Sequence, residues 1–238
     1  MSDTAHFSLP LLAAAQAQKH VTMNEALIRL DALARLTVLR DDLALPPVDV
    51  AEGTTYIVAA SPGGDWTGRE GDIAFAVNGG WDFATPLPGW RAWVLSRSRY
   101  TVWTGDRWVD DLIGPTAAGA YMSADLVLGD EVLSAGASHS TALVIPDRAV
   151  VIGVTARVMS EVTGDGLISW RIGVAGSDNR YGSSIGVQAG ASSNGVTGSP
   201  VAYYADTPLL ITAEGGAFDG GEIRIAVHAL KLTPPDFI

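Results

Sequence analysis

The chain has 238 residues, of which 47% are hydrophobic and 17% are charged. This composition excludes general disorder, and 27 glycines and 12 prolines among short β-branched runs favour turn-rich β structure. The formal net charge of −11 argues against a nucleic-acid partner, and the lack of cysteine excludes disulfides and thiolate metal sites.

Residues 1–45 are the only segment with convincing helical periodicity. Thr22 and Glu25 fit a capping box at the start of an amphipathic helix. The helix is predicted from about Met23 to about Leu39, with apolar positions at Leu27, Leu30, Leu33 and Ala34. A shorter helix is expected over residues 13–18. The main helix either packs on its own module or joins copies from other subunits in a bundle.

The apolar run at residues 9–17 resembles the core of a secretory signal. Because Asp3 is acidic and no Lys or Arg precedes this run, we expect no signal peptide. No run approaches the ~18 apolar residues of a membrane span, so we expect no membrane insertion.

Residues 46–113 form a predicted β-hairpin module that is rich in tryptophan. Six of the seven tryptophans of the chain fall between Trp66 and Trp108. Residues 73–81 and 100–108 each predict a strand, a tight polar turn and a returning aromatic residue. Without disulfides, a module this small must rely on aromatic packing, on a neighbouring module or on another copy of the chain, which favours an oligomer.

The tryptophans have two interpretations. Most of them are expected to fill the small core, in particular Trp81, Trp90, Trp93 and Trp108. One or two rings are expected to stay exposed and to stack on a sugar face or a protein partner. The candidates for this ligand contact are Trp66, which lies in a Gly/Asp loop, and Trp103, which faces opposite to Val102 on its strand.

After a predicted linker at residues 113–120, the pattern changes. Short β-branched runs recur between turns at 125–128, 141–145, 150–158, 167–174, 184–187, 200–204, 209–213 and 223–232. This spacing is typical of a β-sandwich or jelly roll. The expected fold class is therefore mainly β, with a helical N-terminal anchor segment (1–45), a small tryptophan-rich β-hairpin module (46–113) and a jelly-roll-like C-terminal β-sandwich (121–238).

No set of residues indicates catalysis. The four histidines lack metal-ligand spacing, and Ser138-His139-Ser140 lies in a polar turn without a nucleophile elbow. Glycosidases need two carboxyl groups ~5–9.5 Å apart across a cleft. The carboxylate pairs Asp110/Asp111, Asp130/Glu131 and Asp219/Glu222 are instead expected at turns and strand ends. We therefore expect no enzyme activity, no metal and no cofactor.

The N-terminal half resembles a family of unknown-function proteins carried by alphaproteobacterial prophages and gene transfer agents. The opening run LPLLAAAQAQKHVT at residues 9–22 carries the resemblance most specifically. Further matching segments, within a resemblance over about residues 8–112, lie at 24–27, 30–31, 51–58, 89–93 and 106–108. Residues 225–236 resemble the tails of such particle proteins.

This resemblance implies a structural component of a phage-like particle, either a tail fibre or a head spike. Such parts are usually trimeric, with the N-terminal portion anchored to the particle and a distal β domain in contact with the cell surface, often polysaccharide. The family has no established catalytic residues. The predicted protein is a homotrimeric, non-enzymatic fibre or spike subunit of a virion-like particle, made in the host cytoplasm. Its partners are other particle proteins and host surface polysaccharide.

Two alternatives remain open. One is a capsule-degrading glycosidase (depolymerase), which would need a cleft with two acids. The other is a purely structural connector in the tail or baseplate that binds no ligand.

Overall fold

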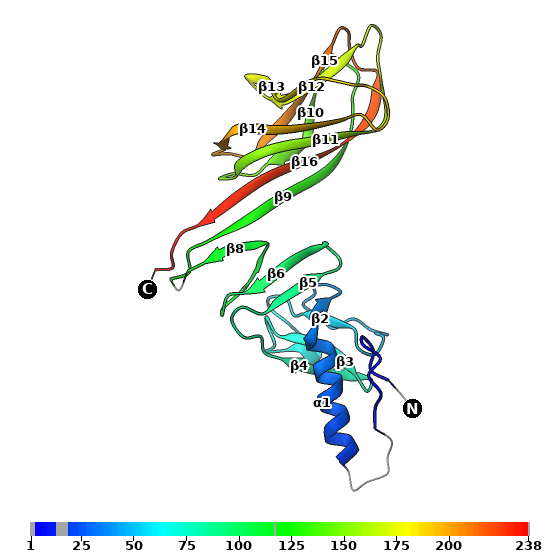
Figure 1. Ribbon diagram of the computed structural model, residues 1–238, viewed down its shortest axis with the longest axis vertical. Helices are drawn as coiled ribbons and strands as arrows, with labels where there is room; N and C mark the ends of the chain where they lie inside the picture. The colour runs from blue at the N-terminus through cyan, green and yellow to red at the C-terminus, as the bar shows by residue number, and fades with distance from the viewer. Residues whose placement is uncertain (1–2, 13–18, 117, 238) are drawn as a thin grey trace. The chain divides into compact units, whose positions relative to one another are not determined.

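The structure is a computed structural model that describes residues 3–12, 19–116 and 118–237. It is mainly β, as predicted, and divides into two compact units, Met1–Leu112 and Ile113–Ile238 (Figure 1). We call them the N-terminal and C-terminal units. The expected helical segment and the tryptophan-rich module lie together in the N-terminal unit. Within the described part of the chain, no helix has the length and apolarity needed to cross a membrane.

The N-terminal unit consists of one helix and two small sheets. Helix α1 spans Lys19–Ala34, and the 3-10 helix η1 spans Gly64–Trp66. The larger sheet has the order β1 (Thr37–Val38), β5 (Arg91–Val94), β6 (Arg99–Trp103) and β7 (Trp108–Asp110), with β1 parallel to β5. The smaller sheet has the order β2 (Thr55–Ile57), β3 (Ile73–Val77) and β4 (Gly80–Ala84).

The predicted ends of the main helix are wrong. Helix α1 already includes Lys19, so Thr22 and Glu25 lie inside it and do not form a capping box at its start. The helix ends before Leu39 because Thr37 and Val38 pair with β5. The shorter helix expected at residues 13–18 lies outside the described residues.

Helix α1 packs on its own unit, in agreement with the first of the two interpretations, but Leu30 of its predicted apolar face is 57% exposed. Its partly or fully buried side chains Ile28, Ala32 and Leu33 join a hydrophobic cluster with residues of both sheets. The buried members from the sheets and from the segment after the helix are Leu36, Val38, Ile57, Ile73, Phe75, Ala84, Ala92 and Val94. The core of the unit on the helix side is therefore mainly aliphatic, with Phe75 buried in it and Trp90 and Trp108 packed against it.

The tight polar turn predicted within residues 73–81 is confirmed and lies at Asn78 and Gly79. It joins β3 to β4, and both residues have positive φ, 52° and 73°. The Glu52 carboxylate accepts hydrogen bonds from both backbone N–H groups at 3.0 Å. A side chain from a distant loop thus reinforces a turn that its own sequence already favours.

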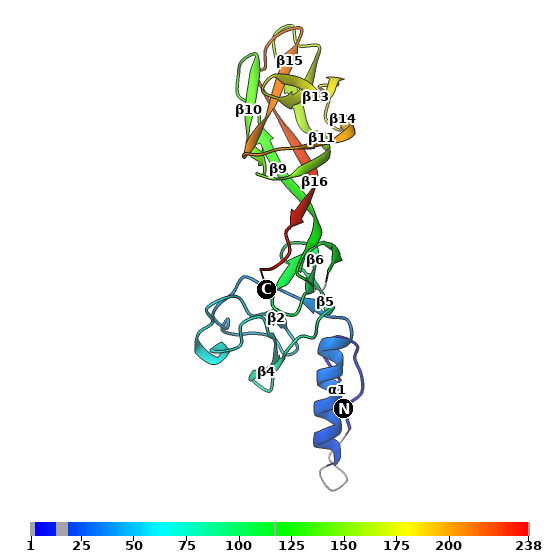
Figure 2. The ribbon, with the colours of Figure 1, turned by 90° about the vertical axis from the view of Figure 1, so that its left-hand side faces the viewer.

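The C-terminal unit is a β-sandwich. The five-stranded sheet has the order β14 (Ser192–Ala202), β11 (Val150–Thr163), β16 (Gly220–Thr233), β9 (Tyr121–Val132) and β8 (Leu112–Pro115). The four-stranded sheet has the order β10 (Ser138–Ile145), β15 (Thr207–Glu214), β12 (Ser169–Val174) and β13 (Ser177–Ile185). Strand β9 pairs with β16 along its whole length, and the two strands appear side by side in Figures 1 and 2. Strand β8 occupies part of the predicted linker.

The two sheets enclose one hydrophobic core. Side chains from both sheets are fully buried in it, including Trp170, Ile211 and Ile225. The Trp170 indole donates a hydrogen bond to the Gly186 carbonyl at 3.0 Å, so its polar atom is satisfied inside the core. This tryptophan is structural.

Candidate ligand-binding cleft

A cleft of about 640 Å³ lies beside the β6–β7 hairpin of the N-terminal unit. We call it the tryptophan cleft. Trp103 and Trp108 both line it, and they are direct partners in the β6–β7 register. Their ring centroids lie 5.5 Å apart with an angle of 57° between the ring planes. Together they give the cleft a broad aromatic wall.

Glycine at position 71 holds this wall in place. The Trp108 indole N–H donates a hydrogen bond to the Gly71 carbonyl at 2.8 Å. Gly71 has a φ of +77°, and a Cβ atom there would lie 2.9 Å from Cη2 of Trp103. Both the backbone conformation and the close ring therefore require glycine.

A buried hydroxyl without a partner also lines the tryptophan cleft. Thr101 is fully buried, and its Oγ1 forms no hydrogen bond with any described residue. A buried polar group left unsatisfied costs about 1–3 kcal/mol.

We expect Thr101→Val to leave the free energy of unfolding unchanged, or to raise it by about 1 kcal/mol, because valine keeps the shape and removes the unsatisfied oxygen. Thr141→Val is the matched control, since the buried Thr141 hydroxyl donates to the Leu143 carbonyl at 2.6 Å and accepts from the Leu209 N–H at 2.9 Å. That control should lose about 1–3 kcal/mol. Denaturant unfolding measures both, and equal losses would contradict the assignment of an unpartnered hydroxyl to Thr101.

The charges in the tryptophan cleft are mostly acidic. Arg97 forms ion pairs with Asp41 and with Asp110, and the second lies at 2.5 Å. The hydrogen bond with Asp110, together with that to Asp41, raises the pKa of Arg97 further above its usual value, so the guanidinium stays charged. Glu70 and Asp106 also line the cleft and are exposed. Carboxylates accept hydrogen bonds, so the acidic side chains of this cleft can bind groups that donate hydrogen bonds.

The two tryptophans proposed as ligand contacts have different environments. Trp103 is half-buried in the tryptophan cleft and stays a candidate. The prediction that Trp66 stays exposed is wrong, because its side chain is 0% exposed. Trp66 ends the 3-10 helix, which turns its ring inward between Tyr56 and Trp81, at centroid distances of 5.6 Å and 5.1 Å. It is a core residue and cannot stack on a ligand.

Two of the three acidic pairs of the sequence, Asp110/Asp111 and Asp130/Glu131, take part in structural contacts. Asp110 and Asp111 face Arg97 and Arg99 in ion pairs. Asp130 forms a bidentate ion pair with Arg224, with hydrogen bonds of 2.6 and 2.7 Å. Asp219 is exposed and lies just before β16. Over residues 3–12, 19–116 and 118–237, no group of three or more acidic or histidine side chains is placed to hold a metal.

A Ser–His–Glu hydrogen-bond chain in the C-terminal unit could not be seen in the sequence. The Ser134 hydroxyl lies 3.0 Å from Nδ1 of His139, whose Nε2 lies 3.2 Å from the Glu131 carboxylate. The order resembles a hydrolase triad. However, the Ser134 backbone N–H donates to the same Nδ1, and both Glu131 oxygens accept backbone N–H groups of Ala142 and Leu143. These hydrogen bonds among Ser134, His139 and Glu131 therefore support the irregular stretch between Ser140 and Val144 in β10.

Comparison with known proteins finds a family match for one part of the chain. Residues 23–109 match the model of a family described as "Protein of unknown function (DUF2793)". This range contains every residue named above as lining the tryptophan cleft except Asp110, and it lies inside the segment that resembles a family of unknown function. No curated protein matches the chain.

Two solved structures show low similarity. A chain of the cyanophage Pam1 capsid asymmetric unit has 22% identity and a TM-score of 0.33, with 50% of this chain and 90% of that chain covered. A chain from the Bacillus endospore appendages, described as disulfide-linked pili, has 18% identity and a TM-score of 0.21, with 50% and 97% covered. At these TM-scores neither likeness defines the fold or the function. The comparisons thus show similarity to the family of unknown function over residues 23–109.

Proposed function

We propose that this protein is a non-enzymatic structural subunit of a phage-like particle, a fibre or spike subunit that assembles as a homotrimer. In this proposal the N-terminal unit attaches to other particle proteins, and the C-terminal β-sandwich contacts polysaccharide on the host cell surface. Three copies would bind a repetitive surface far more firmly than one, because a second contact becomes intramolecular. The observation that supports assembly best is the outer face of the five-stranded sheet.

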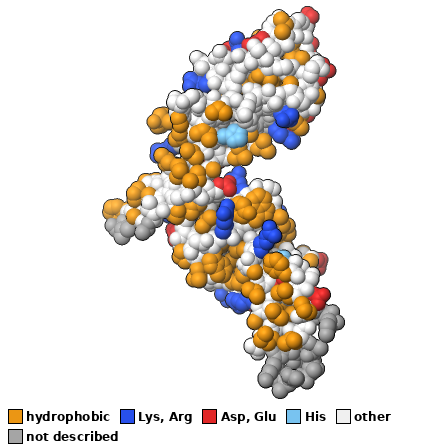
Figure 3. Space-filling model, in the orientation of Figure 1, with side chains coloured by type: hydrophobic (Ala, Val, Ile, Leu, Met, Phe, Trp, Pro, Cys, Tyr) orange, Lys and Arg blue, Asp and Glu red, His pale blue; other side chains and the backbone are white. Residues whose placement is uncertain are grey.

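Apolar side chains cover much of this outer face. Leu126 and Leu128 of β9 lie opposite His228 and Ala226 of β16, so all four point to the side away from the buried Val227. Leu128 is 61% exposed. Figure 3 shows hydrophobic and uncharged side chains around a histidine over β9 and β16. Exposed apolar patches of this kind mark interaction surfaces.

The charges on the two outer faces of the sandwich differ. On the five-stranded sheet, Asp130 and Arg224 neutralise each other as a pair. On the four-stranded sheet, Arg171 lies with Asp178 and Glu214 in a charged cluster. Copies of a chain with a net charge of −11 repel each other unless they meet through a surface without an excess of negative charge. Arg157 lies next to Arg224 on the five-stranded face, and with Asp130 these side chains carry no excess of negative charge. A second copy of the same chain is therefore the proposed occupant of this face.

A hollow on the same face could receive a side chain of the neighbouring copy. Its volume is about 500 Å³, and Leu128, Met159 and Ala226 are among its lining residues. Fully buried apolar anchors in such hollows supply most of the affinity of protein interfaces.

The mass of the protein in solution tests this proposal. We expect the mass of three chains, and we expect Leu128→Asp to give single chains with an unchanged circular dichroism spectrum, because a buried unpaired charge opposes association. Ile168→Asp is the matched control, since Ile168 is 75% exposed outside the five-stranded sheet and should keep the wild-type mass. A wild-type protein that stays a single chain at micromolar concentration would contradict the assembly.

Two further measurements separate the alternatives. Incubation with host capsule should release no new reducing ends, and their appearance would favour the depolymerase. Binding of the full chain to encapsulated cells, lost when the capsule is removed, is expected for the fibre or spike subunit. Equal or absent binding to both kinds of cell would favour the connector.

A further inference from the structure

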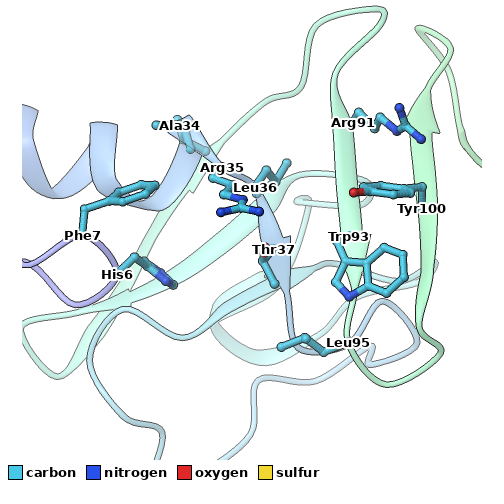
Figure 4. A pocket seen from close by; sticks show the side chains of 11 residues that line it. His6, Phe7, Ala34, Arg35, Leu36, Thr37, Arg91, Trp93, Leu95 and Tyr100 are labelled. Atoms are coloured by element: carbon cyan, nitrogen blue, oxygen red, sulfur yellow. The ribbon is translucent and has the colours of Figure 1, made fainter.

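A second cleft of the N-terminal unit lies on the other face of the β5–β6 hairpin. Its volume is about 710 Å³ (Figure 4), and we call it the arginine cleft. Trp93 and Tyr100 are direct partners in the register and both line it. The next pair, Ala92 and Thr101, is fully buried on the opposite side of the strands. Strand alternation thus gives one hairpin two differently lined clefts.

One wall of the arginine cleft is a column of stacked side chains. The Arg91 guanidinium lies over the Tyr100 ring, 3.9 Å from its centroid. The Trp93 ring meets Tyr100 edge to face, with centroids 4.7 Å apart and an angle of 69°. Figure 4 shows this column on β5 and β6, with the Tyr100 hydroxyl turned toward the cleft. Stacking fixes the plane of the Arg91 guanidinium and leaves its N–H edge available.

The opposite wall comes from the N-terminal segment. Figure 4 shows His6 and Phe7 across from the column, with Arg35 between the two walls. His6 is anchored by a hydrogen bond between Nε2 and the Gly53 carbonyl at 2.9 Å. The buried Asp31 carboxylate accepts hydrogen bonds from the backbone N–H groups of His6 and Phe7, both at 2.8 Å. Both walls therefore exist before any ligand binds.

The charge of the arginine cleft is opposite to that of the whole chain. Its described lining contains two arginines and one histidine and no acidic side chain, whereas the chain has a net charge of −11. Both Arg35 and Arg91 are exposed, and neither forms an ion pair with a described residue. Arg29, Arg40, Arg97 and Arg224 each pair with an aspartate. Two arginines without counter-ions in one aromatic cleft indicate an anionic ligand.

We propose that the arginine cleft binds a carboxylated sugar, as found in an acidic polysaccharide. Arg35 and Arg91 hold the carboxylate, and Trp93 and Phe7 contact the apolar faces of the sugar rings. A guanidinium matches a carboxylate through two parallel hydrogen bonds. The cleft volume lies within the ~300–1,000 Å³ of small-ligand sites.

The strand edges argue against a peptide as the ligand. Extended peptides usually bind by adding a strand to an open sheet edge. Here β1 and β5 already bond to each other, through Trp93 N–H to the Leu36 carbonyl at 3.0 Å and Leu95 N–H to the Val38 carbonyl at 2.9 Å. Recognition in the arginine cleft therefore depends on side chains, and stacked aromatic rings with guanidinium groups suit a charged sugar. The site lies within one copy and in the other unit from the proposed cell-surface contact, so it does not depend on assembly.

Calorimetric titration of the full chain with trigalacturonate at low salt tests the proposal. We expect saturable binding that weakens as salt is added. The same trisaccharide with its carboxyl groups methyl-esterified should bind at least about tenfold more weakly, because it keeps the rings and loses the charge. Arg35→Gln and Arg91→Gln should each weaken binding about tenfold. Arg148→Gln, at an exposed arginine of the C-terminal unit, should bind as the wild type does.

Three results would overturn the proposal. They are equal binding of the methyl-esterified sugar, unchanged binding by Arg35→Gln, and binding of triglutamate as tight as that of trigalacturonate, which would assign the cleft to acidic peptides. Arg35 is exposed, so its variant is expected to fold, and its melting temperature checks this. The mass of the protein in solution is measured in parallel. A single-chain mass together with sugar binding would contradict the trimer but would not contradict this binding site.

Discussion

Replacement of Trp66 by alanine should lower the free energy of unfolding of the N-terminal unit by about 3–5 kcal/mol. The Trp66 ring is 0% exposed and is packed in a small cluster with Tyr56, Val58 and Ala74. Trp81 lies nearly perpendicular to it, at an interplanar angle of 80°. A unit with so few large buried side chains cannot close around the cavity that alanine would leave. Denaturant unfolding followed by tryptophan fluorescence measures the loss.

Two variants sharpen this prediction. Trp66→Phe should cost less, about 1–2 kcal/mol, because the Trp66 indole N–H has no hydrogen-bond partner among the described residues and phenylalanine loses only volume. Trp103→Ala should also cost about 1–2 kcal/mol, since its ring is only half-buried. It should weaken the binding of a ligand in the tryptophan cleft. A loss for Trp103→Ala as large as that for Trp66→Ala would make Trp103 a core residue.

The strands of the C-terminal unit could be predicted because their pattern is local. Ile223, Ile225 and Val227 alternate with outward residues in the sequence, and the structure buries all three completely. Strands β13 and β14 were predicted too short, because their residues 177–183 and 192–199 are rich in Ser, Gly and Asn. Their extended form comes from pairing with β12 and β11, as in the pair of Asn194 with Thr155. Strand formation there depends on neighbours more than on intrinsic propensity.

The clefts could be predicted only in part. Alternation on β6 identified Trp103 as a residue that faces away from Val102, and it does line a cleft. The loop around Trp66 suggested exposure, but a 3-10 turn directs the ring into the core. The arginine cleft joins residues 6–7, Arg35 and strands β5 and β6, which are far apart in the chain. No local sequence pattern predicts that these residues lie together, because their contact depends on how the N-terminal segment docks on the helix.

That docking depends on Asp31. This carboxylate of α1 is 3% exposed and accepts three hydrogen bonds from the N-terminal segment, including one from the Thr4 hydroxyl at 2.7 Å. Asp31→Asn should lower the free energy of unfolding by about 2–3 kcal/mol, because an amide turns a donor toward groups that already donate. Hydrogen exchange of residues 3–10 should rise. Asp82→Asn is the control, since Asp82 pairs with Arg29 in an exposed contact and should cost at most about 1 kcal/mol.

The stabilisation that Asp31 provides should decrease as the pH falls. Burial alone would raise the pKa of Asp31, but hydrogen bonds from the His6 backbone, the Thr4 hydroxyl and the Phe7 backbone lower it below its ordinary 3.8. A carboxyl whose pKa is lower in the folded state stabilises fully above its unfolded pKa of about 4. This stabilisation is lost as the pH falls through the lower, folded-state pKa. Unfolding curves of wild type and Asp31→Asn should therefore converge in acid. If the difference in free energy of unfolding between wild type and Asp31→Asn stays constant down to that pH, the loss comes from packing and not from the charge. If the difference disappears in acid, and Asp31→Asn also binds the sugar more weakly at neutral pH, the charged carboxylate holds the wall that carries His6 and Phe7.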